Sequence, residues 1–318
     1  MSRHRKHQPS PLYRLRHETL MKLIDLYRRK SFVFSIEVFP AKTAEGMETL
    51  KQTLGTFAKF RPDYFSVTYG AGGGTRENTH ALATHLQNKL GIETMAHLTC
   101  VSHTGQEIEV VLRRLEKSGI ENVMALRGDP PQGSTEFRRP ENAYNYACEL
   151  VAAIQKRGGF GIGAAGYPEG HIENPDQDAD RHFLVGKINA GADFIATQFF
   201  LDNSFFLRWR DQLAADGVSV PLVPGLLVPT SLKQLTRMAD FCGISIPNKL
   251  RIQLETHHTD PEAMKQIGLE HTSRQLENLL REGIPGIHLY ALNKLATVQH
   301  LAPLLPYSSK NLLAPCAA

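Results

Sequence analysis

The stretch NVMALRGDPPQG, residues 122–133, delivers an arginine and a carboxylate directly after a short apolar run. The run VMAL has the length of a strand that is buried on both faces, and the two prolines prevent a longer strand or an immediate helix. Arg127 and Asp129 are therefore expected at the end of a buried strand. A carboxylate there is costly unless it is solvated, paired or bound to a ligand. The residues alone leave open an Arg127–Asp129 ion pair that only closes the loop.

Glu37 is a second carboxylate in an unusual position, because it lies inside the apolar stretch FSIEVFP. A carboxyl group in apolar surroundings keeps its proton more readily and is suited to donate it near neutral pH. The sequence therefore predicts a general acid at Glu37. The structural alternative is an ion pair with a lysine such as Lys42.

Further polar residues end or follow other apolar runs in the same way. Together with Glu37 they form this set: Thr68, Tyr69, His97, Thr99, Arg127, Asp129, Tyr167, His171 and Gln198. One such residue usually has a structural explanation, but each desolvated polar group without a partner costs about 1–3 kcal/mol. Since six predicted strands carry them, we expect a ligand site where the strand ends meet.

Two glycine-rich stretches bear on the kind of ligand. Residues 161–166 match G-x-G-x-x-G, but the dinucleotide fingerprint must follow a strand and open a helix. Here the glycines lie within the predicted strand, which excludes that fingerprint and favours close approach by a flat ligand or a neighbouring strand. Residues 70–74 could present backbone N–H groups to a phosphate or form a flexible loop, and both remain open.

Composition limits the class of protein. The chain has 318 residues, of which 42% are hydrophobic and 21% charged, enough for one large core. The net charge of +4 is mild and concentrated near the N-terminus, so it does not indicate a nucleic-acid partner. Residues 1–17 are expected to form a disordered basic tail, with a transit peptide as the alternative, and 18–318 the catalytic domain. No segment has the apolar length of a membrane span.

Cysteine usage and histidine spacing give no indication of a metal. The cysteines form no C-x-x-C pair and are Cys100, Cys148, Cys242 and Cys316. They are expected to be reduced thiols in a cytoplasmic protein. His257 and His258 follow Glu255 closely, but adjacent ligands do not share a helix face, so a solvated helix end is the preferred interpretation.

Eight apolar segments are predicted to be strands, and they recur roughly every 30 residues, the length of one strand–helix unit. They span residues 32–39, 64–69, 95–100, 122–126, 160–165, 194–200, 221–228 and 287–292. Helical patterns cover residues 18–30, 106–118, 142–156, 180–190, 204–215, 231–241 and 261–282, with a further helix at 247–255. We predict a single-domain α/β fold, the (β/α)8 TIM barrel, with a doubly wound sheet as the alternative. Barrel strand ends meet at one mouth, where catalytic side chains gather.

From about residue 32 to about residue 301 the chain resembles the 5,10-methylenetetrahydrofolate reductase family in its short bacterial form. The motifs that carry the resemblance are FSIEVFPAKT, YFSVTYGAGGGTRENT, AHLTC, VMALRGDPP, AAGYPEGH, NAGADFIATQFFLD, VPGLLVPTS and HLYALNK. It implies a (β/α)8 barrel that binds FAD at the C-terminal ends of the strands and takes hydride from NADH or NADPH. It further implies reduction of methylenetetrahydrofolate to 5-methyltetrahydrofolate for methionine biosynthesis, and a homo-oligomer.

The resemblance also implies roles for individual residues. Glu37 matches the acid that protonates N10 of the folate, and Asp129 the carboxylate that stabilises the cationic iminium. Gln198, Gln234 and Lys294 match substrate-side positions, Gln198 being the amide that bonds the pterin or the nicotinamide. The flavin-contacting positions are Thr68, Tyr69, Ala71, His97, Arg127, Gly128, Asp129, Tyr167, His171, Asp180 and Lys187.

Some positions depart from the family pattern. Val38 and Ala41 stand where an aromatic residue and a second proline are usual, and Met238 where bacterial enzymes often have phenylalanine. Phe183 and Gly186 replace polar residues that typically help to hold the flavin. Two other hypotheses therefore stay open beside a flavin-dependent folate reductase: a pterin-binding barrel that transfers a methyl group without flavin, and a flavoprotein that only binds partners.

Overall fold

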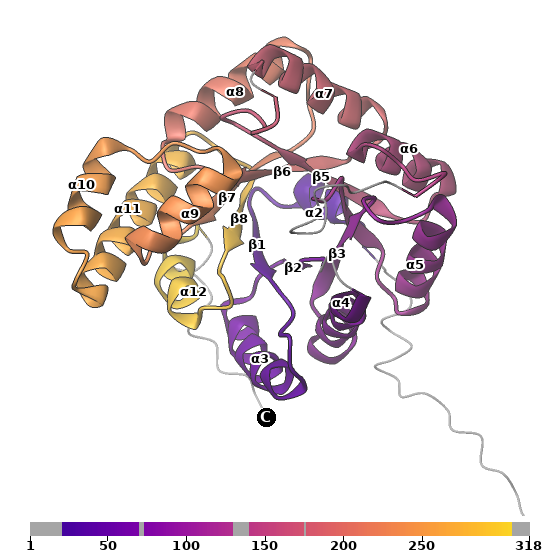
Figure 1. Cartoon of the computed structure of the whole chain (residues 1–318), viewed down its shortest axis with the longest axis horizontal. Helices are drawn as coiled ribbons and strands as arrows, with labels where there is room; N and C mark the ends of the chain where they lie inside the picture. Colours follow the sequence, from indigo (N-terminus) through magenta and orange to yellow (C-terminus); the bar gives the residue numbers. More distant parts are fainter. Residues whose placement is uncertain (1–20, 70–72, 130–139, 175, 307–318) are drawn as a thin grey trace, which may run out of the picture.

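The computed structural model describes residues 21–69, 73–129, 140–174 and 176–306. Its strands are parallel and form one closed barrel in chain order, in which β8 pairs with β1 (Figure 1). They are β1 (Val33–Val38), β2 (Tyr64–Val67), β3 (Glu93–Thr99), β4 (Asn122–Leu126), β5 (Gly161–Gly166), β6 (Phe194–Phe199), β7 (Leu222–Leu227) and β8 (Gly286–Tyr290). The predicted (β/α)8 barrel is confirmed, and the doubly wound sheet is wrong. The predicted tail, residues 1–17, lies outside the described residues.

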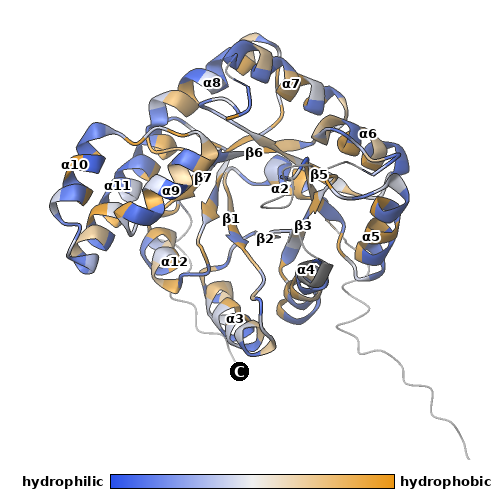
Figure 2. Ribbon diagram, in the orientation of Figure 1, coloured by the Kyte–Doolittle hydropathy of each residue, from blue (hydrophilic) through white to orange (hydrophobic). Residues whose placement is uncertain are grey.

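A ring of helices surrounds the strands, and hydrophilic residues are concentrated on it (Figure 2). The helices are α2 (Leu23–Arg29), α3 (Ala44–Phe57), α4 (Gly73–His85), α5 (Gly105–Lys117), α6 (Ala147–Arg157), α7 (Gln177–Asn189), α8 (Asn203–Ala215), α9 (Leu232–Cys242), α10 (Asn248–Thr256), α11 (Pro261–Arg281) and α12 (Leu295–Leu301). Local chemistry sets their ends: α5 begins with a capping box between Thr104 and Glu107.

Helix α6 differs from its prediction, because it begins at Ala147 rather than at residue 142. Asn142 has φ +62°, a left-handed conformation that no helix continues, and its carbonyl accepts a hydrogen bond from the Gly105 N–H. The predicted extra helix before β8 is confirmed as α10, which packs with α9 and α11 around Leu235, Leu250 and Leu254. None of the helices in the described ranges is both long and apolar enough to cross a membrane.

The floor of the barrel is closed by the N-terminal helix α2. Leu23 and Leu26 join an apolar cluster whose strand members include Val33, Met95 and Phe194. The Asn122 side chain fixes this helix, because its Oδ1 accepts from the Leu23 N–H at 2.8 Å and its Nδ2 donates to the Met21 carbonyl at 3.1 Å. Ligands therefore have the opposite end, the mouth, as the natural place to bind.

Candidate active site

Strand β1 places Ser35 and Glu37 inside the barrel. Successive strand residues face opposite sides, and Phe34, Ile36 and Val38 pack in the core between strands and helices. The same alternation applies to β8, where Ile287 and Leu289 face that core. The register then sets Ser35 opposite His288 and Glu37 opposite Ser66 and Tyr290.

Two histidines flank the Glu37 carboxyl group. Its Oε2 lies 3.5 Å from Nε2 of His97 and 3.4 Å from Nε2 of His288. Each ring is held by a buried serine, since His97 Nε2 is 2.6 Å from Ser66 Oγ and His288 Nδ1 is 2.8 Å from Ser35 Oγ. Glu37 is thus surrounded by histidines rather than paired with Lys42. Its side chain is still 18% exposed, so it can reach a ligand at the mouth.

Burial lowers the pKa of His97 to about 4, and the attraction of Glu37 opposes this shift only in part. The imidazole is therefore neutral near pH 7. A folded-state pKa below the ordinary 6.5 means that the unfolded chain binds the proton first as the pH falls. Stability from this residue is present above pH 6.5 and is lost as the pH falls towards 4.

We expect His97→Gln to flatten this part of the pH dependence. Between pH 6.5 and pH 4 the wild type should lose up to about 3 kcal/mol more unfolding free energy than the variant. Urea denaturation at a series of pH values measures the difference. Parallel stability curves for the two proteins would contradict a buried neutral His97.

Arg127 and Asp129 lie after β4, as predicted, but they are not chiefly paired with each other. The Arg127 guanidinium donates two hydrogen bonds to Glu173, one of them at 2.8 Å to Oε1, while Asp129 Oδ1 is 3.9 Å away. The Asp129 side chain is 69% exposed. The loop-closing partner of Arg127 is therefore Glu173, and Asp129 is left facing solvent at the mouth. Between them Gly128 has φ +79°, and a Cβ there would lie 2.6 Å from Val101 Cγ1.

A second cation lies beyond β5. Lys187 of α7 donates through Nζ to the Ala165 carbonyl at 2.6 Å and lies 5.7 Å from the Tyr167 ring centroid. Burial lowers the pKa of Lys187 to about 8, and the carboxylate of Asp180 opposes this shift. Tyr167 meets the His171 ring edge to face at 4.7 Å. Arg127 and Tyr167 follow the neighbouring strands β4 and β5, as the sequence predicts, whereas Asp180 and Lys187 lie on α7 and were expected only from the resemblance.

The remaining predicted residues are spread around the mouth. Tyr69 contacts His103, with its hydroxyl 3.0 Å from Nε2, and the backbone of Thr68 continues from β2. Ala71 lies outside the described residues. Gln198 is the last residue but one of β6, whereas Gln234 on α9 and Lys294 after β8 are exposed. Lys294 Nζ donates to Thr230 Oγ1 at 2.8 Å.

The donor set at β4 and β5 fits a ligand that carries phosphate groups. Arg127 and Lys187 supply positive charge, and guanidinium groups bind phosphate in a bidentate manner. The loop after β5 also holds a buried donor, Asn174 Nδ2, that has no hydrogen-bond partner within the described parts of the chain. Glu169 Oε1 is likewise buried without a partner, but as a carboxylate oxygen it does not suit a phosphate. The small residues of β5 do not form a ligand cradle, since a Cβ at Gly163 or Gly166 would meet Phe194, Ile195 or Trp209 of the protein itself. They allow neighbouring side chains to approach.

The residues of this site that were not predicted individually include Ser35, Ser66, Glu173 and His288. His288 lies between apolar residues in β8, the same pattern that singled out Glu37. Ser35 was hidden inside an apolar strand as a small neutral residue. Glu173 lies in a polar loop, where nothing in the local sequence distinguishes it.

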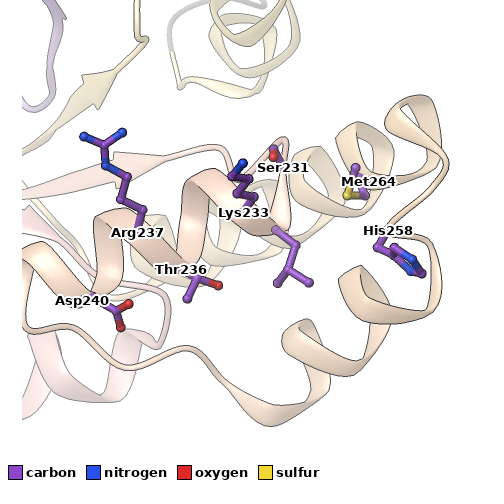
Figure 3. Close-up of a pocket in the computed structure, with 8 residues that line it drawn as sticks. Ser231, Lys233, Thr236, Arg237, Asp240, His258 and Met264 are labelled. Atoms are coloured by element: carbon purple, nitrogen blue, oxygen red, sulfur yellow. The ribbon is translucent and has the colours of Figure 1, made fainter.

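One groove of the described structure lies outside the barrel mouth. Its volume is about 660 Å³, and it runs along α9, α10 and α11 (Figure 3). Lys233 and Arg237 point to one side of α9, and Thr236 and Asp240 to the other. Because these side chains diverge, they form no convergent site. A cavity of about 260 Å³ lies nearer the mouth and is lined by Tyr69, His97 and His103 with charged residues of α4 and α5. No cluster that could hold a metal ion occurs among the residues described by the structure.

Fold and site together define a (β/α)8 barrel with a carboxyl group held between two histidines at its mouth, and with a cationic wall that consists of Arg127 and Lys187 beside β4 and β5. A protein-family model described as methylenetetrahydrofolate reductase matches residues 22–303. The chain belongs to the methylenetetrahydrofolate reductase family.

Individual relatives agree with this assignment. The chain is 36% identical over 260 residues to 5,10-methylenetetrahydrofolate reductase of Pectobacterium carotovorum, covering 82% of this chain and 85% of that protein. It is 36% identical over 288 residues to methylenetetrahydrofolate reductase (NADH) 1 of Arabidopsis thaliana, covering 86% of this chain but only 49% of the plant protein. The chain thus spans about half the length of the plant relatives that it matches.

A solved structure shares the fold. It is an uncharacterized protein from Clostridium thermocellum that binds two copies of 5-methyl-5,6,7,8-tetrahydrofolic acid, and it matches with a TM-score of 0.57 and 18% identity. The match covers 88% of this chain and 95% of that one.

Proposed function

We propose that this protein reduces 5,10-methylenetetrahydrofolate to 5-methyltetrahydrofolate, with FAD as cofactor and NADH or NADPH as hydride donor. The observation that carries the proposal is the Glu37 carboxyl group, held between His97 and His288 at the mouth of a barrel of this family. The proposal places the reaction in one-carbon metabolism and methionine biosynthesis. It also includes a cytoplasmic homo-oligomer without a nucleic-acid or membrane partner.

Glu37 is proposed to donate a proton to N10 of the folate. An amine nitrogen is a poor leaving group until it is protonated, so opening the five-membered ring needs a positioned acid. The buried histidines and serines around Glu37 hold its carboxyl group in one place, which favours transfer along one direction. Asp129, exposed at the same mouth, is proposed to stabilise the positive charge that develops on the substrate. Gln198, Gln234 and Lys294 are proposed to bind the folate.

The cationic wall is proposed to hold FAD. Arg127 and Lys187 would bind its phosphates, and Tyr167 with His171 would offer an aromatic surface. Thr68, Tyr69, Ala71, His97, Gly128 and Asp180 complete the proposed flavin site. FAD supplies hydride transfer between the nicotinamide and the folate. The part of the protein is to bind and orient these molecules and to supply the proton.

Purified protein tests the proposal directly. It should be yellow, should bleach under anaerobic conditions when NADH or NADPH is added, and should regain colour when methylenetetrahydrofolate follows. Titration with each nicotinamide separately identifies the donor. A yellow protein that bleaches with neither nicotinamide would contradict the proposed reductase.

Arg127→Ala is expected to weaken flavin binding by about tenfold or more, because it removes a planar set of donors that suits phosphate. Flavin content of the purified, folded variant measures the effect. Arg157→Ala is the matched control, since Arg157 also bonds to glutamate side chains, Glu109 and Glu116, and is similarly buried but lies at the end of α6. Full flavin retention in Arg127→Ala would place the flavin elsewhere.

One observation favours a second candidate, a barrel that binds a pterin and transfers its methyl group without flavin. On α7, Phe183 is 67% exposed and nothing lies within 4 Å of a Cβ built on Gly186. The resemblance expects polar residues that contact flavin at both positions. A colourless protein that still binds methyltetrahydrofolate would support this second candidate.

A further inference from the structure

The hydrogen bonds of Ser35 define the proton positions on His288. Ser35 Oγ lies 3.1 Å from the Ile287 carbonyl and 2.8 Å from His288 Nδ1. A hydroxyl group has one proton, and a carbonyl oxygen can only accept. Both bonds therefore form together only when Ser35 donates to Ile287 and accepts from an N–H at Nδ1 of His288.

With its proton on Nδ1, a neutral His288 turns the lone pair of Nε2 towards Glu37 Oε2, 3.4 Å away. A carboxylate oxygen and an unprotonated ring nitrogen are both acceptors, so this contact is favourable only when a proton lies between them. His288 is 1% exposed, and a buried ring disfavours the fully charged imidazolium–carboxylate form. A Glu37 carboxyl group that carries the acid proton can therefore donate a hydrogen bond to His288.

Other groups around Glu37 do not replace His288 as the acceptor. His97 approaches the same oxygen at 3.5 Å, but its Nε2 makes a much shorter contact of 2.6 Å with Ser66 Oγ. On β8, the Tyr290 hydroxyl donates to the Thr197 carbonyl at 2.7 Å. On β2, the Tyr64 hydroxyl contacts the Tyr27 hydroxyl at 3.0 Å and also hydrogen-bonds with Ser35, whose oxygen can accept from it while Ser35 donates to Ile287. Burial raises the pKa of both tyrosines, so they stay neutral.

We propose that His288 is a positioning residue that accepts a hydrogen bond from the Glu37 carboxyl group when this group carries the acid proton, with Ser35 fixing the tautomer of the ring. The proposal rests on the proposed role of Glu37 as general acid. When Glu37 gives its proton to the substrate nitrogen, the pair changes from neutral to a carboxylate beside a neutral imidazole. Solvent then returns one proton to Glu37 through the open mouth after product leaves, which restores the pair for the next turnover.

His288→Gln tests the proposal, because an amide keeps polarity and can donate to Glu37 but cannot accept the acid proton as a base. The folate half-reaction should lose activity on the alkaline side about one pH unit earlier than in the wild type, and fall about tenfold at neutral pH. The rate at which NADH reduces the bound flavin should stay within about twofold of the wild-type rate, since this half-reaction needs no proton from Glu37. Ser35→Ala should shift the profile in the same direction by less.

His300→Gln is the matched control. The His300 ring also contacts a serine, Ser273, at 3.0 Å, and that serine donates to the Leu269 carbonyl, but the pair lies between α11 and α12. Its pH profile should equal that of the wild type. If His288→Gln lowers the folate rate equally at all pH values, His288 is merely structural and the proposal is wrong.

Infrared difference spectroscopy of the ligand-free protein gives a readout that is independent of catalysis. As the pH is lowered, the band of a protonated carboxyl group at this site should appear in the wild type, be absent in Glu37→Gln and be altered in His288→Gln. A wild-type protein that shows this band but does not reduce the folate would overturn the proposed function, whereas the hydrogen bond from Glu37 to His288 would stand. A band that His288→Gln leaves unchanged would overturn only the proposed hydrogen bond from Glu37 to His288.

Discussion

Glu37→Gln is expected to slow the reduction of methylenetetrahydrofolate by about 10²–10⁴-fold, the usual contribution of a positioned acid. Glutamine keeps the shape of the side chain and a contact with His97 and His288, but it has no proton to give. Oxidation of NADH or NADPH by the flavin-loaded protein should be nearly unchanged. Stopped-flow absorbance of the two half-reactions, each measured alone, separates the two effects.

Glu121→Gln is a suitable control for this experiment. Glu121 is also a partly buried carboxyl group, and burial raises its pKa, but it precedes β4 at the floor of the barrel. Its half-reactions should match the wild type. Asp129→Asn should differ from both, because it removes a charge near both proposed ligands and so disturbs both half-reactions. Equal slowing of both steps by Glu37→Gln would make Glu37 a structural or flavin-binding residue.

Lys187→Met is expected to stabilise the ligand-free protein by roughly 2 kcal/mol at neutral pH while abolishing tight flavin binding. The pKa of Lys187 in the folded protein, about 8, lies below the ordinary value of 10.5 because burial disfavours the charged amine. At neutral pH the folded protein therefore carries a buried charge that lowers its stability. Its cost is fully present below pH 8 and is relieved as the pH rises from 8 to 10.5. The stability gain of the variant should shrink over the same interval.

Urea denaturation with and without added FAD measures both parts of this prediction. Without FAD the variant should be more stable than the wild type, and with excess FAD less stable, because only the wild type gains from binding. Lys233→Met on the exposed side of α9 should change neither quantity. A Lys187→Met protein that is no more stable than the wild type at pH 7 would contradict the burial of a charged amine.

The fold was predictable because each strand is an apolar run that ends in polar residues, and because the runs recur at the length of one strand–helix unit. Glu37 was predictable for the same reason, as a carboxylate inside such a run. The contacts of Glu37 with its partners were not predictable, because His288 is distant in sequence and meets Glu37 only through the register that closes β8 on β1. Such a register depends on closure of the whole barrel.

The contacts that loop residues make could not be predicted from the local sequence pattern either. Arg127 and Asp129 are neighbours in sequence and suggested a pair, but the loop after β5 brings the Glu173 carboxylate into better geometry for the guanidinium. The early start predicted for α6 failed at Asn142, whose left-handed backbone is set by a bond from Gly105 at the start of α5. In both cases the deciding contact joins segments that belong to different strand–helix units.

Closure of the floor by α2 has a consequence for synthesis on the ribosome. Leu23 is among the first described residues to emerge, yet its apolar neighbours include Phe194 and Val223, made some 170 to 200 residues later. At roughly 5–20 residues per second this interval lasts on the order of ten to forty seconds. Throughout it, the apolar face of α2 lacks the part of its partner surface that β6 and β7 supply. This part of α2 is therefore exposed to chaperones and to aggregation until the later strands are made.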